Sequence, residues 1–379
     1  MVGTRTEMVF ALWVTYSRHL HASQKPLSMD TPALDAASPL RQPSPGQTPA
    51  HTPDVMSDSE DSSEDEPMDM TKTKDNKDKN TSALSATAET TTTATSELTK
   101  TTSAQSTEPP KKRTMDDFVI LEDMGQGAYG QVKLARNKIT GKKVVLKYVT
   151  KRRILVDTWT RDRKLGTVPL EIHVLNYLRK PEFRHPNIVE MEGFFEDDVN
   201  YYIEMAPHGL PGMDLFDYIE LRANMEEAEC RTIFVQVAQA IHFLHTKALV
   251  VHRDIKDENV ILDGEGNIKI IDFGSAAYIK SGPFDVFVGT IDYAAPEVLA
   301  GKPYGGKEQD VWALGILLYT IIYKENPFYS IDEIMDRDLR VPYTISEESI
   351  DLIRHMLDRD VEQRYDITQV LAHPWCKTE

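Results

Sequence analysis

Apolar and polar positions alternate over short stretches from Phe118 onward. Between residues 118 and 149 the pattern is interrupted twice, once by a glycine-rich turn and once at Thr140-Gly141. Short apolar runs separated by such turn residues predict strand, turn, strand, turn and strand. We therefore expect a small sheet at the start of the folded part of the chain.

Helical spacing follows the third of these strands. Leu170, Val174 and Leu178 lie four residues apart, which places them on one side of a helix. Residues 311–323 form an apolar run that is too short to span a membrane. We interpret this second segment as a helix of the protein core.

The first 113 residues have a different composition. No Phe, Tyr or Trp occurs between Tyr16 and Phe118, residues 57–69 are mostly acidic, and residues 81–108 are mostly Thr and Ser. Such a segment buries too little apolar surface to offset the entropy of ordering it. We predict that residues 1–113 form a disordered tail, either a solvated linker or a regulatory segment phosphorylated at its Ser-Pro and Thr-Pro pairs.

Charge and cysteine content limit the classes of partner and compartment. The formal net charge is −17, and residues 114–379 hold most of it, with 31 Lys and Arg against 44 Asp and Glu. This balance argues against a nucleic-acid binder. Cys230 and Cys376 are the only cysteines, so a disulfide framework is excluded and a reducing compartment fits. The apolar run Met8–Val14 is too short to span a membrane, and we expect a cytoplasmic or nuclear protein.

Three glycines occupy the first predicted turn. Gly125, Gly127 and Gly130 form the spacing GxGxxG, which occurs in dinucleotide-binding folds when a helix follows. Here a strand-like pattern (QVKLA) follows instead. A glycine-rich hairpin whose backbone N–H groups cover a triphosphate fits better. On these residues alone, a plain surface hairpin is the alternative.

Two charged residues downstream fit the same phosphate site. Lys147 ends the third predicted strand, where it can pair with the α- and β-phosphates. A lysine used in this way needs a carboxylate to orient it. Glu171 lies on the predicted helix and is the candidate for that role.

A later cluster supplies a proton acceptor and metal ligands. The sequence HRDIKDEN contains Asp254, which can accept the proton of a substrate hydroxyl, and Asn259, and the triplet DFG begins at Asp272. Magnesium prefers hard oxygen ligands and is commonly shared between protein carboxylates and phosphates. We therefore predict Mg²⁺ at Asn259 and Asp272.

Taken in order, these motifs resemble those of eukaryotic protein kinases. The glycine loop, VVLK, the helix glutamate, HRDIKDEN, DFG and APE occur in the expected order over residues 118–375. The resemblance implies an α+β fold of two lobes, with the kinase domain at 114–375. Its N-lobe (about 118–204) would hold a small antiparallel sheet and one helix. Its C-lobe (about 205–375) would be mainly helical, with ATP in the cleft.

The resemblance assigns roles to individual residues. Those implied to act in catalysis are Asp254, Lys256, Lys147 and Glu171. Those implied to hold magnesium are Asn259 and Asp272. Those implied to contact ATP are Gly125, Gln126, Gly127, Ala128, Tyr129, Gly130, Val132, Val145, Lys147, Glu204, Ala206 and Asp214.

Further residues would have structural roles. Asp310 would brace the catalytic loop, and Arg364 would pair with Glu297 in a buried ion pair. Ile203 would stand at the back of the adenine site, and Val145 occupies a position where most kinases have alanine. The residues implied to stack in the buried column of an active kinase are Leu175, Met191, His252 and Phe273.

The same motifs bear on activity and on the hydroxyl that is phosphorylated. A pseudokinase scaffold, the alternative reading, would lack the strand lysine, the catalytic aspartate or a metal ligand, and none is missing. Lys256 in the catalytic loop and Thr290 before APE are typical of the Ser/Thr branch. The resemblance therefore implies a Ser/Thr protein kinase rather than a tyrosine kinase.

The activation segment, SAAYIKSGPFDVFVGTIDY from Ser275, departs from the usual kinase pattern. Many kinases carry a phosphorylatable residue three positions before the glycine of the Gly-Thr pair; here that glycine is Gly289 and the position holds Val286. Arg253, which would bind such a phosphate, is present nevertheless. We hypothesise that the segment is ordered without phosphorylation, whereas Arg253 bonding only to backbone is the alternative. The residues expected to supply packing and charge instead are Phe284, Asp285 and Phe287.

Two acidic residues bear on the substrate. Asp214 and Glu258 match kinase positions close to a basic substrate residue. Together with the acidic domain they suggest a preference for Arg or Lys upstream of the Ser or Thr, and ordinary surface acidity is the alternative. The expected partners are protein substrates, with no nucleic acid and no membrane span, and the kinase domain is expected to be monomeric.

Long stretches resemble the fungal form of the PAS domain-containing Ser/Thr kinases. They include RILVDTWTRDRKLGTVPLEIHVL, FFEDDVNYYIEMAPHGLPGMDLFDYIE and VVHRDIKDENVILDGEGNIKIIDFGSAAYIK. That family senses nutrient state and steers sugar storage by phosphorylating metabolic enzymes. Residues 17–117 lack aromatic residues, so we expect no PAS domain there. A calcium/calmodulin-kinase-like or energy-sensing kinase without its regulatory region is the alternative.

Overall fold

The computed structural model describes residues 113–127, 130–210 and 212–377. All of them belong to one compact unit, Thr99–Glu379. The predicted disordered tail lies outside the described residues except for Arg113, and so do Ala128 and Tyr129 of the glycine loop.

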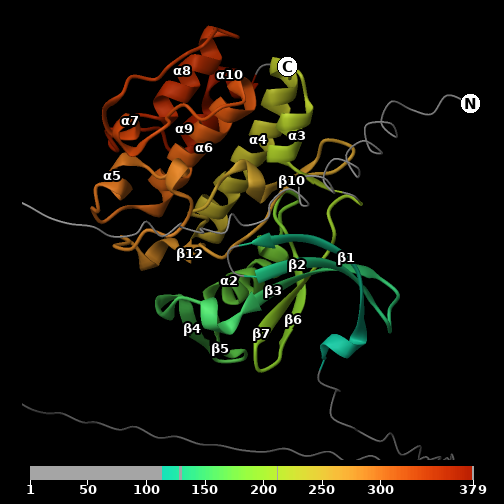
Figure 1. The fold of residues 1–379 in the computed structure, drawn as a ribbon. Coiled ribbons are helices and arrows are strands. Elements are labelled where there is room, and N and C mark those ends of the chain that lie inside the picture. The colour runs from blue at the N-terminus through green and yellow to red at the C-terminus, as the bar shows by residue number, and fades with distance from the viewer. Residues whose placement is uncertain (1–112, 128–129, 211, 378–379) are drawn as a thin grey trace, which may run out of the picture. The chain divides into compact units, whose positions relative to one another are not determined.

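A five-stranded antiparallel sheet forms the first lobe (Figure 1). The strand order is β1-β2-β3-β7-β6, and a single turn of 3-10 helix, Met115–Asp117, precedes it. The predicted succession of three strands and two turns is confirmed, with Gly141 in the second turn at φ +71°. The strands are β1 (Phe118–Gly127), β2 (Gly130–Asn137), β3 (Lys143–Thr150), β6 (Met191–Glu196) and β7 (Asn200–Met205).

One α-helix, α2 (Leu170–Leu178), accompanies this sheet. Val174 and Leu178 are buried, as their spacing predicted, and Leu170 is half-buried. A hairpin that the pattern did not predict, β4 (Trp159–Asp162) and β5 (Gly166–Pro169), leads into the helix and lies beside it (Figure 1). Charged residues in this segment obscure the alternation of apolar and polar positions that would indicate strands. Short 3-10 turns nearby are Lys151–Arg153, Val156–Thr158 and Pro181–Phe183.

The second lobe is mainly helical, as the kinase resemblance implied. Its helix α6 is buried on nearly every side, which confirms that 311–323 is a core helix, since a helix apolar all round must be surrounded by protein. No helix in the described part of the chain is both long and apolar enough to cross a membrane. The helices are α3 (Leu215–Leu221), α4 (Glu227–Phe243), α5 (Pro296–Leu299), α6 (Gly306–Tyr323), α7 (Ile331–Asp336), α8 (Glu347–Met356), α9 (Ile367–Ala372) and α10 (Pro374–Lys377).

Short strands and turns hold the loops between these helices. One small sheet has the order β11-β10-β8, and another pairs β12 with β9. The strands are β8 (Met213–Asp214), β9 (Val250–Val251), β10 (Val260–Leu262), β11 (Ile268–Ile270) and β12 (Ala277–Tyr278). The short helical turns are Leu244–Ala248, Asp257–Asn259, Ile279–Ser281 and Ile291–Tyr293.

The hydrophobic core is continuous through both lobes. Leu175 of α2 and Trp312 of α6 belong to the same buried cluster. A second cluster lies on the other face of the sheet, because side chains alternate across a strand. There the ring of Phe195 stacks on Phe118 and on Tyr202, with centroid separations of 5.4 and 4.8 Å.

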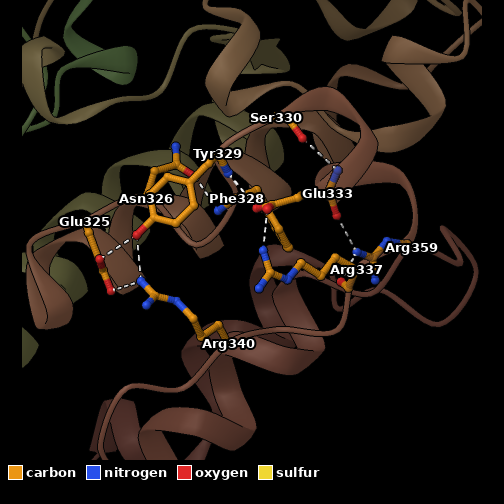
Figure 2. A network of polar contacts seen from close by, with 9 residues as sticks. All are labelled: Glu325, Asn326, Phe328, Tyr329, Ser330, Glu333, Arg337, Arg340 and Arg359. Atoms are coloured by element: carbon orange, nitrogen blue, oxygen red, sulfur yellow. Dashed lines mark hydrogen bonds and ion pairs between the residues drawn. The ribbon is translucent and has the colours of Figure 1, made fainter.

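A polar network surrounds α7 (Figure 2). The Tyr329 hydroxyl donates to Glu325 at 2.7 Å, and the Arg340 guanidinium donates to the same hydroxyl at 2.6 Å and pairs with Glu325 (Figure 2). Arg337 pairs with Glu333 one helical turn away, and its side chain is 51% exposed. This pair is a surface ion pair and is worth little stability.

A buried ion pair links three segments of the same lobe. Arg364 donates from both terminal nitrogens to Glu297, at 2.7 and 2.8 Å, and its side chain is fully buried. The guanidinium also donates to the carbonyls of Glu308 at 3.0 Å and Asp358 at 2.9 Å. The ion pair expected from the resemblance is therefore present, and it ties α5 to the start of α6.

Replacing Arg364 by Ala should lower the free energy of unfolding by about 3 kcal/mol, because Glu297 would keep its charge without a partner. Thermal or urea unfolding of the full chain measures the loss. Arg337→Ala, which removes the exposed partner of Glu333, serves as the matched control and should leave the melting temperature nearly unchanged. Equal losses in the two variants would contradict the structural role assigned to Arg364.

Candidate active site

Lys147 joins three segments that lie far apart in the sequence. Its Nζ lies 2.7 Å from Oε1 of Glu171 on α2 and 2.7 Å from Oδ1 of Asp272 in the DFG triplet. The side chains of Lys147 and Glu171 are only 9% and 6% exposed. The structure thus brings these three sequence-predicted residues together at one point.

Burial and charge compete at this cluster. Burial alone would lower the pKa of Lys147, but Glu171 and Asp272 outweigh it and raise that pKa well above its usual range. For Glu171 burial prevails over Lys147, so the pKa of its carboxyl is raised. For Asp272 the effect of burial is outweighed by Lys147, and its pKa is lowered. Asp272 is therefore held as a carboxylate, the form that binds a metal ion.

The predicted proton acceptor, Asp254, is held from two sides. The Thr290 hydroxyl donates to Oδ1 at 2.8 Å. The Asn259 side-chain amide donates to Oδ2 at 3.1 Å and to the Asp254 carbonyl at 2.8 Å. Asp254 itself is only half-buried, so its carboxylate is oriented and still accessible to a substrate hydroxyl.

Asp310 holds the catalytic loop through the backbone. Its two carboxylate oxygens accept the N–H groups of His252 at 2.9 Å and Arg253 at 2.6 Å, and His245 contacts it at 2.8 Å. Arg253 adopts a left-handed φ of 65°, a conformation that costs energy for a residue with a side chain. The expected bracing role of Asp310 thus has a geometric basis, since its bonds hold this unfavourable turn in place.

Gly289 allows the activation segment to approach the catalytic loop. A Cβ atom at this position would lie 2.5 Å from the carbonyl oxygen of Arg253, and φ is +130°. Glycine adopts this φ readily and avoids the clash, because it has no Cβ. The following residue, Thr290, is thereby placed to donate to Asp254.

The DFG segment is oriented toward the lysine. Asp272 has a left-handed φ of 58° and accepts the N–H of Gly274 at 3.0 Å. Phe273 is fully buried and packs edge-on against the His252 ring at a centroid distance of 4.9 Å. All four residues of the predicted column are buried; they are Leu175, Met191, His252 and Phe273.

The predicted magnesium ligands fit a shared metal site. Asn259 and Asp272 supply one amide oxygen and one carboxylate, which suits an ion that takes its remaining ligands from phosphates and water. Among residues 113–127, 130–210 and 212–377, no group of three or more His, Cys, Asp or Glu forms a separate metal cluster. The metal-binding role of Asn259 and Asp272 stays a prediction.

The glycine loop is a β-hairpin, as the strand-like sequence after Gly130 indicated. In β1 and β2, Gly125 pairs with Val132 and Gly127 pairs with Gly130. A Cβ on Gly130 would lie 1.9 Å from the carbonyl oxygen of Tyr148, so β2 can approach β3 only with glycine here. Gln126 is exposed at the end of the hairpin, and Val132 lies opposite Lys147 in the sheet.

The strand β7 leads into the connection between the lobes. Ile203, the predicted gatekeeper, is completely buried and pairs with Lys147 in the sheet. Val145 pairs with Met205, and Ala206 is exposed immediately after the strand. The predicted adenine-binding residues therefore lie at or just after one end of the neighbouring inner strands β3 and β7.

Arg113 was not among the residues that the motifs identified. It forms an ion pair with Glu204, whose side chain is only 4% exposed. Its guanidinium passes close to Gly193 of β6, where a Cβ would lie 3.0 Å away. In the sequence, Arg113 belongs to a basic triplet, KKR, at the start of the domain. This triplet does not indicate that Glu204 is its partner.

The two acids expected near the substrate lie on neighbouring segments. Asp214 caps α3 by accepting the N–H of Asp217 at 2.8 Å. Burial, with Asp217 and Glu258 among the nearby acids, raises the pKa of Asp214 to about 6. Glu258 is exposed and pairs with Lys256. The predicted catalytic lysine is thus adjacent to an acid that could also meet a basic substrate.

Arg253 is contacted by an aromatic ring and a backbone carbonyl. Its Nε donates to the Ser275 carbonyl at 2.7 Å, and its guanidinium lies 4.3 Å from the centroid of the Phe284 ring. Phe287 packs against the core, whereas Asp285 is exposed. Arg253 therefore bonds to a backbone carbonyl, which the alternative expected, and it also packs against Phe284, which our hypothesis expected.

His173 and Tyr278 were also missed by the motif analysis. The Tyr278 hydroxyl contacts Nδ1 of His173 at 2.8 Å, which connects the activation segment to α2. A half-buried histidine on a helix carries no signal in a single sequence, because its partner comes from a segment about 100 residues away.

Comparison with known proteins identifies the family. Residues 118–376 match the family model described as protein kinase domain. The chain is 56% identical over 266 residues to the Serine/threonine-protein kinase PSK1 of Saccharomyces cerevisiae, covering 69% of this chain and 19% of that protein. It is 53% identical over 261 residues to the Serine/threonine-protein kinase ppk6 of Schizosaccharomyces pombe, covering 68% and 33%.

A mammalian relative gives the same result at lower identity. The PAS domain-containing serine/threonine-protein kinase of Mus musculus is 40% identical over 259 residues, which cover 68% of this chain and 18% of that protein. The chain therefore spans a third or less of the length of these three relatives. The matched family model covers more than half of the chain, and the chain belongs to the protein kinase family.

Proposed function

We propose that this protein is an active Ser/Thr protein kinase that transfers the γ-phosphoryl group of ATP to hydroxyl groups of protein substrates. The observation that carries the proposal is the cluster at Lys147, where Glu171 and Asp272 both approach to 2.7 Å. This arrangement requires α2 and the DFG segment to be in their working positions together. It argues against the pseudokinase alternative, which has no need of such a cluster.

In this mechanism each residue positions a group or stabilises a charge. Lys147, oriented by Glu171, binds the α- and β-phosphates. Asp254, held by Thr290 and Asn259, orients the substrate hydroxyl and accepts its proton. Lys256 contributes positive charge beside the transferring group; burial opposes this charge, but Glu258 and other acids raise the pKa of Lys256. Magnesium held by Asn259 and Asp272 would supply charge neutralisation at the phosphates.

We further propose that the substrates carry Arg or Lys upstream of the phosphorylated residue. Asp214 in β8 and Glu258 in the catalytic loop lie on neighbouring segments, and Asp257 is a third acid nearby. Residues 114–379 also hold an excess of acids, 44 against 31 basic residues. Such a field favours the approach of a basic peptide.

We also propose that the kinase is active without phosphorylation of its activation segment. Arg253 is already occupied by Phe284 and the Ser275 carbonyl, and a cation over an aromatic face is attracted to it. Phe284 is in turn held by reciprocal backbone bonds with Tyr304, at 2.9 and 3.0 Å. The segment thus has an ordered alternative to a phosphate.

The similarity to PAS domain-containing kinases supports a role in nutrient and sugar-metabolism signalling. Cys230 and Cys376 are free thiols, which is compatible with action in the cytoplasm or nucleus. We propose that the kinase domain acts as a monomer.

Lys147→Arg should lower kcat about 100-fold or more, because the longer planar guanidinium cannot reproduce the contacts with Glu171 and Asp272. Phosphate transfer to a Ser-containing peptide measures the effect. Lys143→Arg, an exposed lysine on the same strand β3, is the matched control and should retain full activity. Substantial residual transfer by Lys147→Arg would refute the assigned site.

Phosphatase treatment of the protein made in bacteria should leave its activity within a few-fold of the untreated value. The physical reason is that Phe284 and a carbonyl, rather than a phosphate, hold Arg253. Mass spectrometry verifies that the phosphates have been removed, and a kinase with a phosphorylated activation segment provides the comparison. A tenfold or larger drop in activity would contradict the proposal.

The preference for a basic peptide should weaken below pH 6. With a pKa of about 6, Asp214 is about nine-tenths ionised at pH 7 and about one-tenth ionised at pH 5. We compare kcat/KM for an Arg-containing peptide with kcat/KM for the same peptide carrying Ala instead. The ratio of the two should therefore fall severalfold from pH 7 to pH 5. Asp214→Asn should show a low ratio that changes little with pH. A ratio that is flat with pH in the wild type would exclude this role of Asp214.

A further inference from the structure

His173 is a junction of three segments. It lies on α2, and its Nδ1 is 2.8 Å from the hydroxyl of Tyr278 in the activation segment. On the other side of the ring, Nε2 lies 3.3 Å from Oδ2 of Asp162 in the β4–β5 hairpin. The histidine and aspartate side chains are 23% and 27% exposed, so both contacts are partly shielded from water.

Tyr278 is rigidly connected to the catalytic loop. In the β9–β12 pair it lies opposite Val250, and Ala277 lies opposite Val251, the residue just before His252. Its ring also meets Tyr177 of α2 edge-on, at a centroid distance of 5.5 Å. Burial raises the pKa of Tyr278 well above its usual range, so the hydroxyl keeps its proton and can donate it to Nδ1 of His173.

Asp162 is equally well fixed within its hairpin. Its Oδ1 accepts the N–H groups of Lys164 at 2.6 Å and Leu165 at 2.9 Å. These bonds close the turn between β4 and β5 and leave Oδ2 directed at His173. The imidazole is therefore held between two anchored groups, one from each lobe.

The position of His173 determines where Glu171 lies. The two residues are separated by two positions on α2, which is about 200° around a helix. Glu171 thus faces Lys147 while His173 faces the activation segment. Because a helical turn is stiff, a bond that holds one side of α2 restrains both the rotation and the translation of the other side.

We propose that Tyr278 and His173 are positioning residues whose hydrogen bond holds α2 where Glu171 reaches Lys147. The inference rests on the proposed kinase function and deepens it. It identifies a hydroxyl–imidazole contact as a link between the activation segment and α2. This link needs no phosphate, in keeping with Val286 at the position where many kinases are phosphorylated.

A double-mutant cycle on the full chain tests the proposal. Tyr278→Phe keeps the ring and removes the hydroxyl, and His173→Ala removes the acceptor. Each should lower kcat/KM for ATP about three- to tenfold, with KM for the peptide unchanged. The double variant should be no worse than the poorer single variant, because both remove the same bond. His173→Asn, which retains an acceptor oxygen, should recover part of the loss.

Tyr323→Phe provides the matched control. The Tyr323 hydroxyl is buried and has no hydrogen-bond partner within the described part of the chain, so its removal should leave kcat/KM unchanged. A general effect of Tyr→Phe substitution would appear in both variants, whereas the positioning role predicts a loss only at Tyr278.

Hydrogen exchange gives a second readout that does not require catalysis. The amides of α2 should exchange about three- to tenfold faster in Tyr278→Phe than in the wild type, with the melting temperature unchanged. Unchanged exchange in α2, or losses at Tyr278 and His173 that multiply in the double variant, would overturn the inference. An inactive wild type with faster α2 exchange in the variant would instead refute the proposed function and leave the positioning contact supported.

Discussion

The buried cation of Lys147 is the interaction on which the rest of the site depends. An ammonium group is costly to remove from water unless opposite charges and hydrogen bonds replace its hydration. Glu171 and Asp272 do so at 2.7 Å each, and they come from α2 and from the segment after β11. In this arrangement of the segments the two carboxylates offset the cost of burial. That arrangement places the lysine proposed to bind phosphates next to the carboxylate proposed to bind magnesium.

A second constraint acts on the backbone of the catalytic segments. Arg253 and Asp272 both adopt left-handed φ angles, 65° and 58°, which cost on the order of 1 kcal/mol or more for residues with side chains. Asp310 accepts the N–H groups of His252 and Arg253, and Gly274 donates to Asp272. These bonds stabilise the two unfavourable turns, which in turn position Asp254 and the Asp272 side chain.

The activation segment contacts Arg253 and α2 through a carbonyl, an aromatic ring and a tyrosine hydroxyl. The Arg253 guanidinium rests on the Phe284 ring and on a carbonyl, and α2 is joined to the activation segment through Tyr278 and His173. Neither contact depends on a modification. These contacts support the proposal that the activation segment is ordered without phosphorylation.

The sequence by itself determined the kinase family, the order of the lobes and the residues of the cluster at Lys147. The kinase motifs allow this because they combine rare residue types at restricted spacings. It also indicated that Val286 cannot carry a phosphate. The tertiary structure decided the β4–β5 hairpin, whose alternation is masked by charge, and the contacts of Arg113 and His173. Their partners, Glu204 and Tyr278, lie about 90 to 105 residues away. Periodicity and local propensity carry no information about such pairs, since they form only when tertiary packing brings distant segments together.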